Sequence, residues 1–290
     1  MPDPSPPSNG HLYLIPTPLG KQPSNQVLPD YVVQTVHGLD TFFVERIRQA
    51  NSFLRWIKHP IPDYRCRFYE LNKHTPYTEM IEMLALLKQG TQAGIISEAG
   101  CPAIADPGSE LVRLAHHSAI PVTPLVGPSS ILLAVMASGL NGQAFSFHGY
   151  LPKPGPERTE AILRLQNMSA RNSSTQVFME TPFRNNDLLA ELLKELDQDT
   201  FLSIASNLTL EDEQIITRRV SEWHMHPPDL THKPSIFLIL SDQSEHKSAS
   251  STRKSKAIKS QSRSKEMQPG VSPKKKQHKK KPARKKRRAE

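Results

Sequence analysis

Short apolar runs alternate with amphipathic stretches along residues 11–241, and this alternation is the strongest constraint on the fold. Residues 11–17 read HLYLIPT and residues 92–97 read QAGIIS, lengths typical of buried strands. Residues 77–88 instead place their apolar side chains at helical spacing, on one face of a helix. Strands that alternate with helices predict an α/β fold in which a parallel sheet is covered by helices.

The same pattern predicts two such units. In the first, we expect further strands at 39–44, 67–71 and 120–124, and helices at 46–57, 110–117 and 129–136, with residues 145–148 closing the unit. The second repeats the arrangement, with helices at 157–166 and 185–196 and strands at 175–180, 201–207, 214–219 and 235–240. Residues 151–156 (LPKPGP) would break both helix and strand, which predicts an interdomain linker.

The charge is distributed unevenly. Residues 246–290 hold 18 Lys+Arg and 2 Asp+Glu, a charge of +16, so the chain's net +9 leaves −7 for residues 1–245. A segment so rich in charge and so poor in apolar residues cannot bury enough surface to fold. We therefore predict a disordered N-terminus (1–10), α/β domains at 11–150 and 157–245, and a disordered Lys/Arg-rich tail (246–290). The tail predicts binding to a polyanion such as nucleic acid, the alternative being a solubilising tail without a fixed partner.

Several classes of protein are disfavoured. The start of the chain has neither a basic nor an apolar signal region, and no apolar run reaches the length of a bilayer span, so we expect a cytoplasmic protein without membrane contact. Cys66 and Cys101 lack metal-type spacing, which suggests neither a metal site nor a disulfide framework. No GxGxxG, GxxxxGK[ST], GxSxG or HExxH motif occurs.

Two loops could carry chemistry. Residues 97–108, SEAGCPAIADPG, follow a predicted strand, and ligands of open α/β sheets bind beyond the carboxyl ends of strands. The alternative is a plain connection in which Asp106 caps the next helix. Residues 126–130, VGPSS, open a helix whose free N–H groups and hydroxyls could hold a ligand or serve only as a cap.

The succession LYLIPTPLG, IISEAGCPAIADPG, PVTPLVGPSS, FHGYLPKPG, METPFR and SNLTLEDEQ resembles the ribosomal RNA small-subunit methyltransferase I family of the tetrapyrrole methylases. The resemblance covers residues 11–241. It implies two α/β domains with S-adenosylmethionine in the cleft between them, a homodimer, and ribosomal RNA or the small ribosomal subunit as partner. By position it implies cofactor-binding residues at Pro18, Leu19, Gly20, Ser97, Glu98, Ala99, Gly100, Ile104, Asp106, Ser129, Ser130, Met179, Glu180, Asn207, Pro234 and Ser235.

Methylation of a ribose hydroxyl would be helped by a general base, for which His74, Glu98 and His148 are the candidates. Each also has a purely structural alternative: packing, a loop position or backbone capping. The chain departs from the family at residues 44–53 (VERIRQANSF) and around His74, where the first domain would face its substrate. Three hypotheses follow: an RNA 2'-O-methyltransferase anchored by its tail, a methyltransferase for a small molecule or protein, and a non-catalytic RNA-binding or ribosome-assembly factor.

Overall fold

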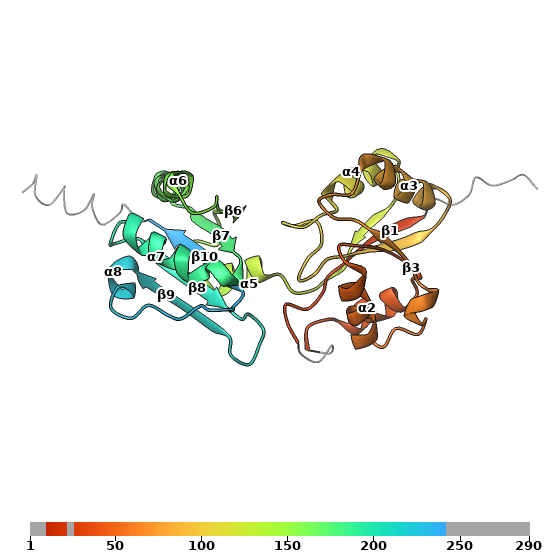
Figure 1. Ribbon diagram of the computed structural model, residues 1–290, viewed down its shortest axis with the longest axis horizontal. Coiled ribbons are helices and arrows are strands. Elements are labelled where there is room, and N and C mark those ends of the chain that lie inside the picture. The colour runs from red at the N-terminus through yellow and green to blue at the C-terminus, as the bar shows by residue number, and fades with distance from the viewer. Residues whose placement is uncertain (1–9, 22–25, 242–290) are drawn as a thin grey trace, which may run out of the picture. The chain divides into compact units, whose positions relative to one another are not determined.

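Two five-stranded sheets form the framework of the chain in a computed structural model that describes residues 10–21 and 26–241 (Figure 1). The first sheet has the strand order β3-β2-β4-β1-β5, and all its pairings are parallel. Its strands are β1 (His11–Ile15), β2 (Thr41–Val44), β3 (Arg67–Glu70), β4 (Gln92–Ile96) and β5 (Val122–Pro124). The parallel sheet predicted for the first half is confirmed.

Helices cover both faces of this sheet. Two consecutive residues of β2, whose side chains point to opposite faces, each pack against a different pair of helices. Phe42 of β2 packs in a core with α1 (Asp30–His37) and α2 (Ile47–Trp56). Phe43 packs instead with α3 (Tyr77–Lys88) and α4 (Ser109–His117). Because both faces are buried, the central strands β2 (TFFV) and β4 (QAGII) are mainly apolar and do not alternate with polar residues, whereas the edge strand β3 (RFYE) is partly exposed.

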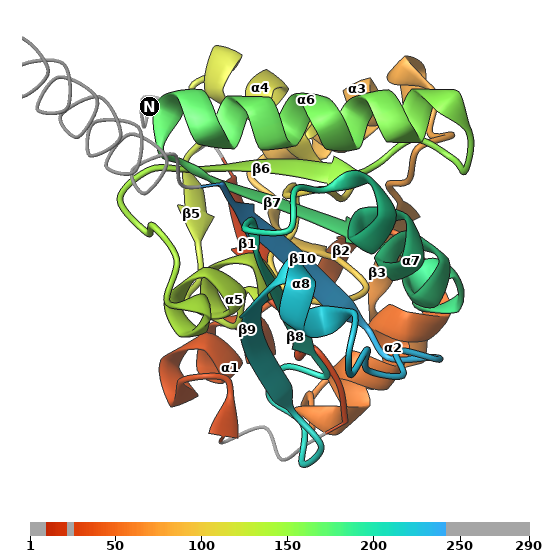
Figure 2. The same ribbon diagram turned by 90° about the vertical axis from the view of Figure 1, so that its left-hand side faces the viewer.

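The second sheet has the order β6-β7-β10-β8-β9, and only its β6–β7 pairing is parallel. Helix α5 (Ser130–Ser138) packs on one face, while α6 (Pro156–Asn172) and α7 (Asn185–Glu195) pack on the other (Figure 2). The strands are β6 (Phe145–Tyr150), β7 (Thr175–Glu180), β8 (Phe201–Ser206), β9 (Gln214–Arg219) and β10 (Ser235–Leu240). Two short elements complete this half, namely α8 (Val220–Trp223) and the 3₁₀ turn η3 (Pro182–Arg184). The first half also contains a 3₁₀ turn, η2 (Asp63–Arg65).

Three expectations about the second half were wrong. The strand expected to close the first unit is β6, which pairs with β7. The helix expected in the first unit is α5, which packs on the second sheet, so the chain crosses between sheets at residues 125–129 and not at 151–156. The sheet is also mainly antiparallel. An apolar run specifies a strand but carries no mark of the partner beside which it will pair.

Two helices were not predicted. The sequence of α1, DYVVQTVH, has β-branched residues that favour strands, and α8 has only four residues. At the N-terminus, Gly10 is buried and donates its N–H to the carbonyl of Leu87 at 2.8 Å, so the predicted disorder does not extend to it. The remainder of that segment and the basic tail lie outside the described residues.

The described residues, 10–21 and 26–241, belong to one compact unit, so the predicted division into two domains stays a prediction. Neither described range contains a helix long and apolar enough to cross a membrane.

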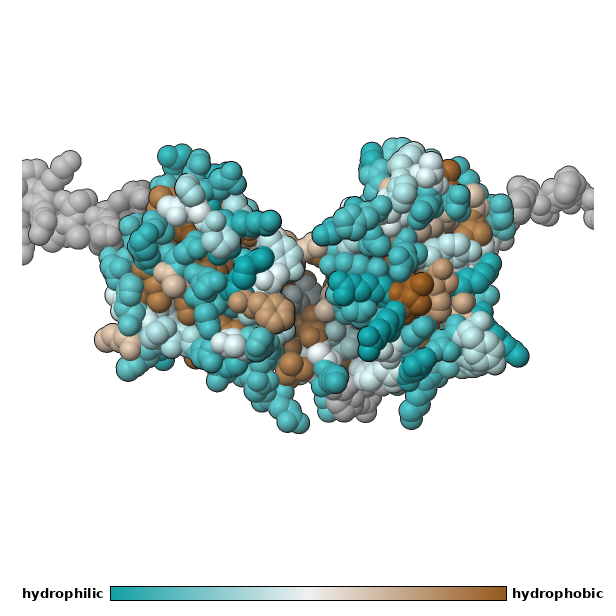
Figure 3. Space-filling view, viewed as in Figure 1, coloured by the Kyte–Doolittle hydropathy of each residue, from teal (hydrophilic) through white to brown (hydrophobic). Residues whose placement is uncertain are grey.

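The face seen in Figure 3 is largely hydrophilic, with apolar side chains gathered in separate patches.

Candidate active site

Three loops of the first sheet are hydrogen-bonded to one another beyond the carboxyl ends of β1, β4 and β5. Thr17 and Gly100 exchange backbone hydrogen bonds, with N–H to O distances of 2.9 and 3.0 Å. The thiol of Cys101 reaches the carbonyl of Pro128 at 3.5 Å. Because these strands are parallel neighbours, their carboxyl ends meet at one edge, where ligands of such sheets bind.

Gly100 allows this close approach. Its φ is +75°, a conformation that side chains rarely adopt, and a Cβ built there would lie 3.3 Å from Cδ2 of Leu19. The glycine therefore lets the loop after β4 turn directly against the loop after β1.

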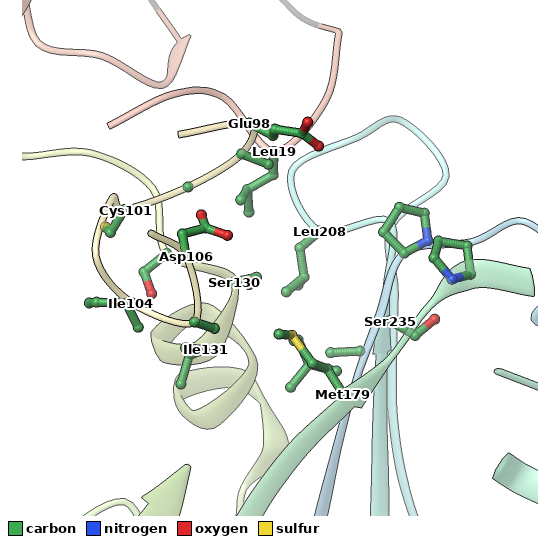
Figure 4. A pocket seen from close by; sticks show the side chains of 18 of the residues that line it. Leu19, Glu98, Cys101, Ile104, Asp106, Ser130, Ile131, Met179, Leu208 and Ser235 are labelled. Atoms are coloured by element: carbon green, nitrogen blue, oxygen red, sulfur yellow. The ribbon is translucent and has the colours of Figure 1, made fainter. Parts of the chain in front are cut away.

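A cavity of about 270 Å³ lies at this edge, and its wall is completed by residues of the second sheet (Figure 4). Thirteen of the sixteen residues that the resemblance implied line it: Leu19, Glu98, Ala99, Gly100, Ile104, Asp106, Ser129, Ser130, Met179, Glu180, Asn207, Pro234 and Ser235. Pro18, Gly20 and Ser97 do not line it. Gly20 packs directly against Leu210, since a Cβ built on Gly20 would collide with the Leu210 side chain. Leu210 lines the cavity, so Gly20 supports the wall from behind.

Ten further lining residues were not predicted, namely Cys101, Ala105, Ile131, Phe147, Tyr150, Pro182, Ala205, Leu208, Leu210 and Ile236. Tyr150 is the most informative of them. The register of β6 against β7 shifts between Phe147 and Tyr150, and Gly149 has a φ of +65°. This bulge directs both aromatic side chains to the cavity, although regular alternation would place them on opposite faces. Gly149, directly after the predicted strand at 145–148, was the available signal.

Carboxylates gather on the first-sheet side of the cavity. Burial, together with the negative charges of Glu45 and Glu98, raises the pKa of Asp106 to about 6, although a hydrogen bond with Ser97 opposes the shift. Burial and the charge of Glu98 also raise the pKa of Glu45. Arg46 offsets part of this charge, its Nε lying 2.9 Å from Oε1 of Glu98.

Asp106 does not cap the following helix. Helix α4 begins after Gly108, and no side chain caps it. Figure 4 shows the carboxylate of Asp106 pointing toward the cavity, with Met179 and Leu208 on the other side. In contrast, Ser129 does cap α5, since its hydroxyl accepts the N–H of Leu132 at 3.5 Å, a long contact that leaves this hydroxyl able to bind a ligand too.

A buried ion network supports the opposite wall. Glu180 lines the cavity at the end of β7, and its Oε2 lies 2.9 Å from the guanidinium of Arg158, whose side chain is 0 % exposed. Oε1 accepts hydrogen bonds from Arg184 at 2.6 Å and from the N–H of Thr181 at 2.7 Å. Burial alone would raise the pKa of Glu180, but these hydrogen bonds outweigh it and hold the pKa below its usual value.

Comparison with known proteins identifies the kind of site. Residues 32–223 match the family described as Tetrapyrrole (Corrin/Porphyrin) Methylases. The chain belongs to this family. A relative in Halalkalibacterium halodurans named Ribosomal RNA small subunit methyltransferase I is 30% identical over 236 residues, which are 81% of this chain and 77% of the relative.

Solved structures show the same methylase fold. The methyltransferase CobJ superposes with a TM-score of 0.54 at 14% identity, over 80% of this chain and 94% of its own. Uroporphyrin-III C-methyl transferase from Thermus thermophilus, complexed with S-adenosyl homocysteine, gives a TM-score of 0.50 at 15% identity, over 80% and 97% of the two chains. This methylase is an S-adenosylmethionine-dependent methyltransferase.

The residues of the methylase cavity suit that cofactor. Its volume of about 270 Å³ is near the lower end of the few hundred Å³ typical of small-molecule sites. Ile104, Ile131 and Met179 offer apolar surface for an adenine ring, and Ser129 and Ser130 lie at the start of a helix, where free N–H groups suit a carboxylate. The carboxylates of Glu98 and Asp106 suit the positive sulfonium and ammonium groups.

Of the three candidate bases, only Glu98 lines the cavity of the methylase. His74 is exposed in the loop after β3, and its own backbone N–H is bound by Asn72 at 2.9 Å. Nε2 of His148 lies 2.7 Å from Oε1 of Gln176, so the ring contacts another residue of the second sheet. This position agrees with the structural alternative for His148, which was packing. The expectation that these two histidines act at the site is therefore not supported by their positions.

Proposed function

We propose that this methylase transfers a methyl group from S-adenosylmethionine to a ribose 2'-hydroxyl of small-subunit (16S) ribosomal RNA. The observation that carries the proposal is the match, over 81% of the chain, to a relative named for methylation of this RNA. The cavity supports it, because it is partly open to solvent, so a macromolecular substrate could approach a cofactor held there.

The proposed roles of the residues follow from charge. The cofactor supplies an electrophilic methyl group on a sulfonium, and the transfer forms an O–C bond while the C–S bond breaks. Asp106 and Glu98 would favour the cationic cofactor over its neutral thioether product, which would assist exchange after each turnover. Glu98, the one candidate base in the cavity, would accept the proton of the hydroxyl. The chain otherwise contributes alignment, the main requirement of an in-line displacement.

The decisive experiment is methyl transfer from labelled S-adenosylmethionine to small ribosomal subunits that lack their own methylations, followed by mapping of the labelled nucleotide. Label at a single ribose would establish the proposal. Glu98→Gln should reduce the rate of methyl transfer at saturating cofactor. The matched control is Asp187→Asn, because Asp187 is an exposed carboxylate on α7. Tight cofactor binding without transfer to the subunit would reject ribosomal RNA as the substrate.

The basic tail is proposed to bind the phosphate backbone of the RNA. Deleting residues 246–290, which hold a charge of +16, should weaken RNA binding and reduce its dependence on salt, because each neutralised phosphate releases a counterion. Titration of small-subunit RNA at several salt concentrations measures this slope. A slope equal to that of the full chain would show that the tail makes no phosphate contacts.

We also propose a homodimer that acts in the cytoplasm, where the ribosomal substrate is found. Helix α5 supports the dimer, because Leu132 and Met136 on it are 53% and 77% exposed. Apolar side chains exposed side by side on one helix are typical of a contact surface. Sedimentation equilibrium tests this, and a monomer at micromolar concentration would contradict it.

A further inference from the structure

Phe183 and His232 form an exposed aromatic pair at the edge of the cavity. Phe183 is 80% exposed, and its ring meets that of His232 edge to face, with the ring centroids 5.1 Å apart. Each belongs to a segment that lines the cavity, since Pro182 directly precedes Phe183 and Pro234 follows His232 by two residues. The pair is therefore adjacent in the chain to residues of the cavity wall.

The loop that carries His232 is held rigidly. The side-chain amide of Asn186 donates to Asp229 and to Thr231 at 3.0 Å each, and its oxygen accepts the N–H of Leu230 at 2.9 Å. Hydrogen bonds from Thr231 and Asn186 lower the pKa of Asp229 to about 2, so this anchor stays charged.

Asn185 fixes the other side of the same loop by donating to the carbonyl of Lys233 at 2.7 Å. Within this frame His232 has a φ of +59°, in the left-handed region that non-glycine residues adopt less often. Its ring contacts that of Phe183.

Packing does not explain Phe183. A side chain that is four-fifths exposed contributes little to a core, so the ring of Phe183 is free to contact a ligand. Cationic residues follow both aromatic residues in the chain, Arg184 and Lys233. Arg184 is fixed by Glu180 and its side chain is still 42% exposed. An exposed aromatic ring beside positive charge suits a nucleotide, with its base stacked on the ring and its phosphate near the cations.

We propose that Phe183 and His232 form a stacking platform for a base of the RNA substrate adjacent to the methylated nucleotide. The inference rests on the proposed function, because it assigns part of the recognition of RNA to these two residues. Stacking tolerates any base, so the platform would position the strand and leave the choice of sequence to other contacts.

Replacing Phe183 tests the platform. Phe183→Ala should raise the KM for small-subunit RNA about 5- to 100-fold, with the effect falling on KM more than on kcat and with an unchanged melting temperature. Phe183→Trp keeps an aromatic ring and should retain the wild-type KM. The matched controls are Tyr64→Ala and Tyr64→Trp, because Tyr64 is 78% exposed on η2, away from the cavity.

Fluorescence gives a direct readout. The new tryptophan of Phe183→Trp adds fluorescence to that of the wild-type protein, and saturating RNA should quench this added fluorescence. The fluorescence added by Tyr64→Trp should change little. If wild type methylates the RNA but Phe183→Ala has the KM of Tyr64→Ala, or the emission of Phe183→Trp is unaffected, the platform is refuted and the function stands. If wild type neither binds nor methylates small-subunit RNA, the proposed function fails, and the platform fails with it.

Discussion

Asp106→Asn is expected to weaken the binding of S-adenosylmethionine by about 10- to 100-fold. The substitution keeps the shape of the side chain but removes a charge that faces the cavity beside Glu98 (Figure 4). A charged partner in a partly buried site is worth roughly 1.5–3 kcal/mol, which corresponds to that range. Isothermal titration calorimetry with the cofactor at pH 7.5 measures the loss, and Asp187→Asn again serves as the control. Equal affinities for the two variants would remove Asp106 from the cofactor site.

The same carboxylate should make binding depend on pH. In the free protein Asp106 has a pKa of about 6, and a cationic ligand favours its charged form, so the pKa falls on binding. The affinity for the cofactor is then highest above about pH 7 and decreases as the pH falls through 6. Because one proton must leave Asp106 for binding, the decrease is at most about tenfold per pH unit. In the Asp106→Asn protein this part of the pH dependence should disappear, which calorimetry between pH 5 and 8 can show.

Stability should change in the opposite direction. A carboxyl group whose pKa is raised by folding stabilises the folded state at low pH, and that contribution is lost as the pH rises through 6. Asp106→Asn should therefore melt at a higher temperature than wild type at pH 7.5, with the difference shrinking near pH 4. A variant that binds less cofactor and is nevertheless more stable would mark Asp106 as a residue kept for function.

Arg158→Met is expected to lower the free energy of unfolding by about 3 kcal/mol, because loss of one partner from a buried ion pair leaves the other uncompensated. Arg158 is 0 % and Glu180 1 % exposed in their side chains, although Glu180 keeps Arg184 as a second partner. Urea unfolding with an unchanged slope measures the effect, and Arg164→Met, an exposed position on the same helix, is the control.

A second substitution tests whether the lost energy belongs to the pair. If it does, Arg158→Met combined with Glu180→Gln should be destabilised by less than the sum of the two single variants. Additive effects would mean that Arg158 acts chiefly through packing, or through its hydrogen bond to the carbonyl of Pro152 at 2.8 Å.

The parts of the site that could be predicted are those with local signals. A strand that ends in a loop of glycine, proline and aspartate, as after β4, indicates where ligands bind, and most residues of that loop do line the cavity. The family resemblance supplied the residues of the second sheet, which lie far away in the sequence.

The rest depends on contacts that no local pattern records. Glu45 comes close to Asp106 because β2 and β4 are neighbours in the sheet, which the sequence does not specify. Tyr150 faces the cavity through a bulge, and Arg158 lies on a helix that begins PERTEA, where an arginine would be expected at the surface. That arginine is buried because Glu180 is there to neutralise it.

The crossing between the two sheets also limits how the chain can be rearranged. Segments that join two halves of a protein are commonly the places where it tolerates cutting, insertion or new termini. Here the crossing at residues 125–129 ends in Ser129, which lines the cavity, and continues directly into α5, which packs on the second sheet. A split or circularly permuted version opened at this point would break the cavity wall and detach a core helix together, so the two halves cannot be separated there as independent pieces.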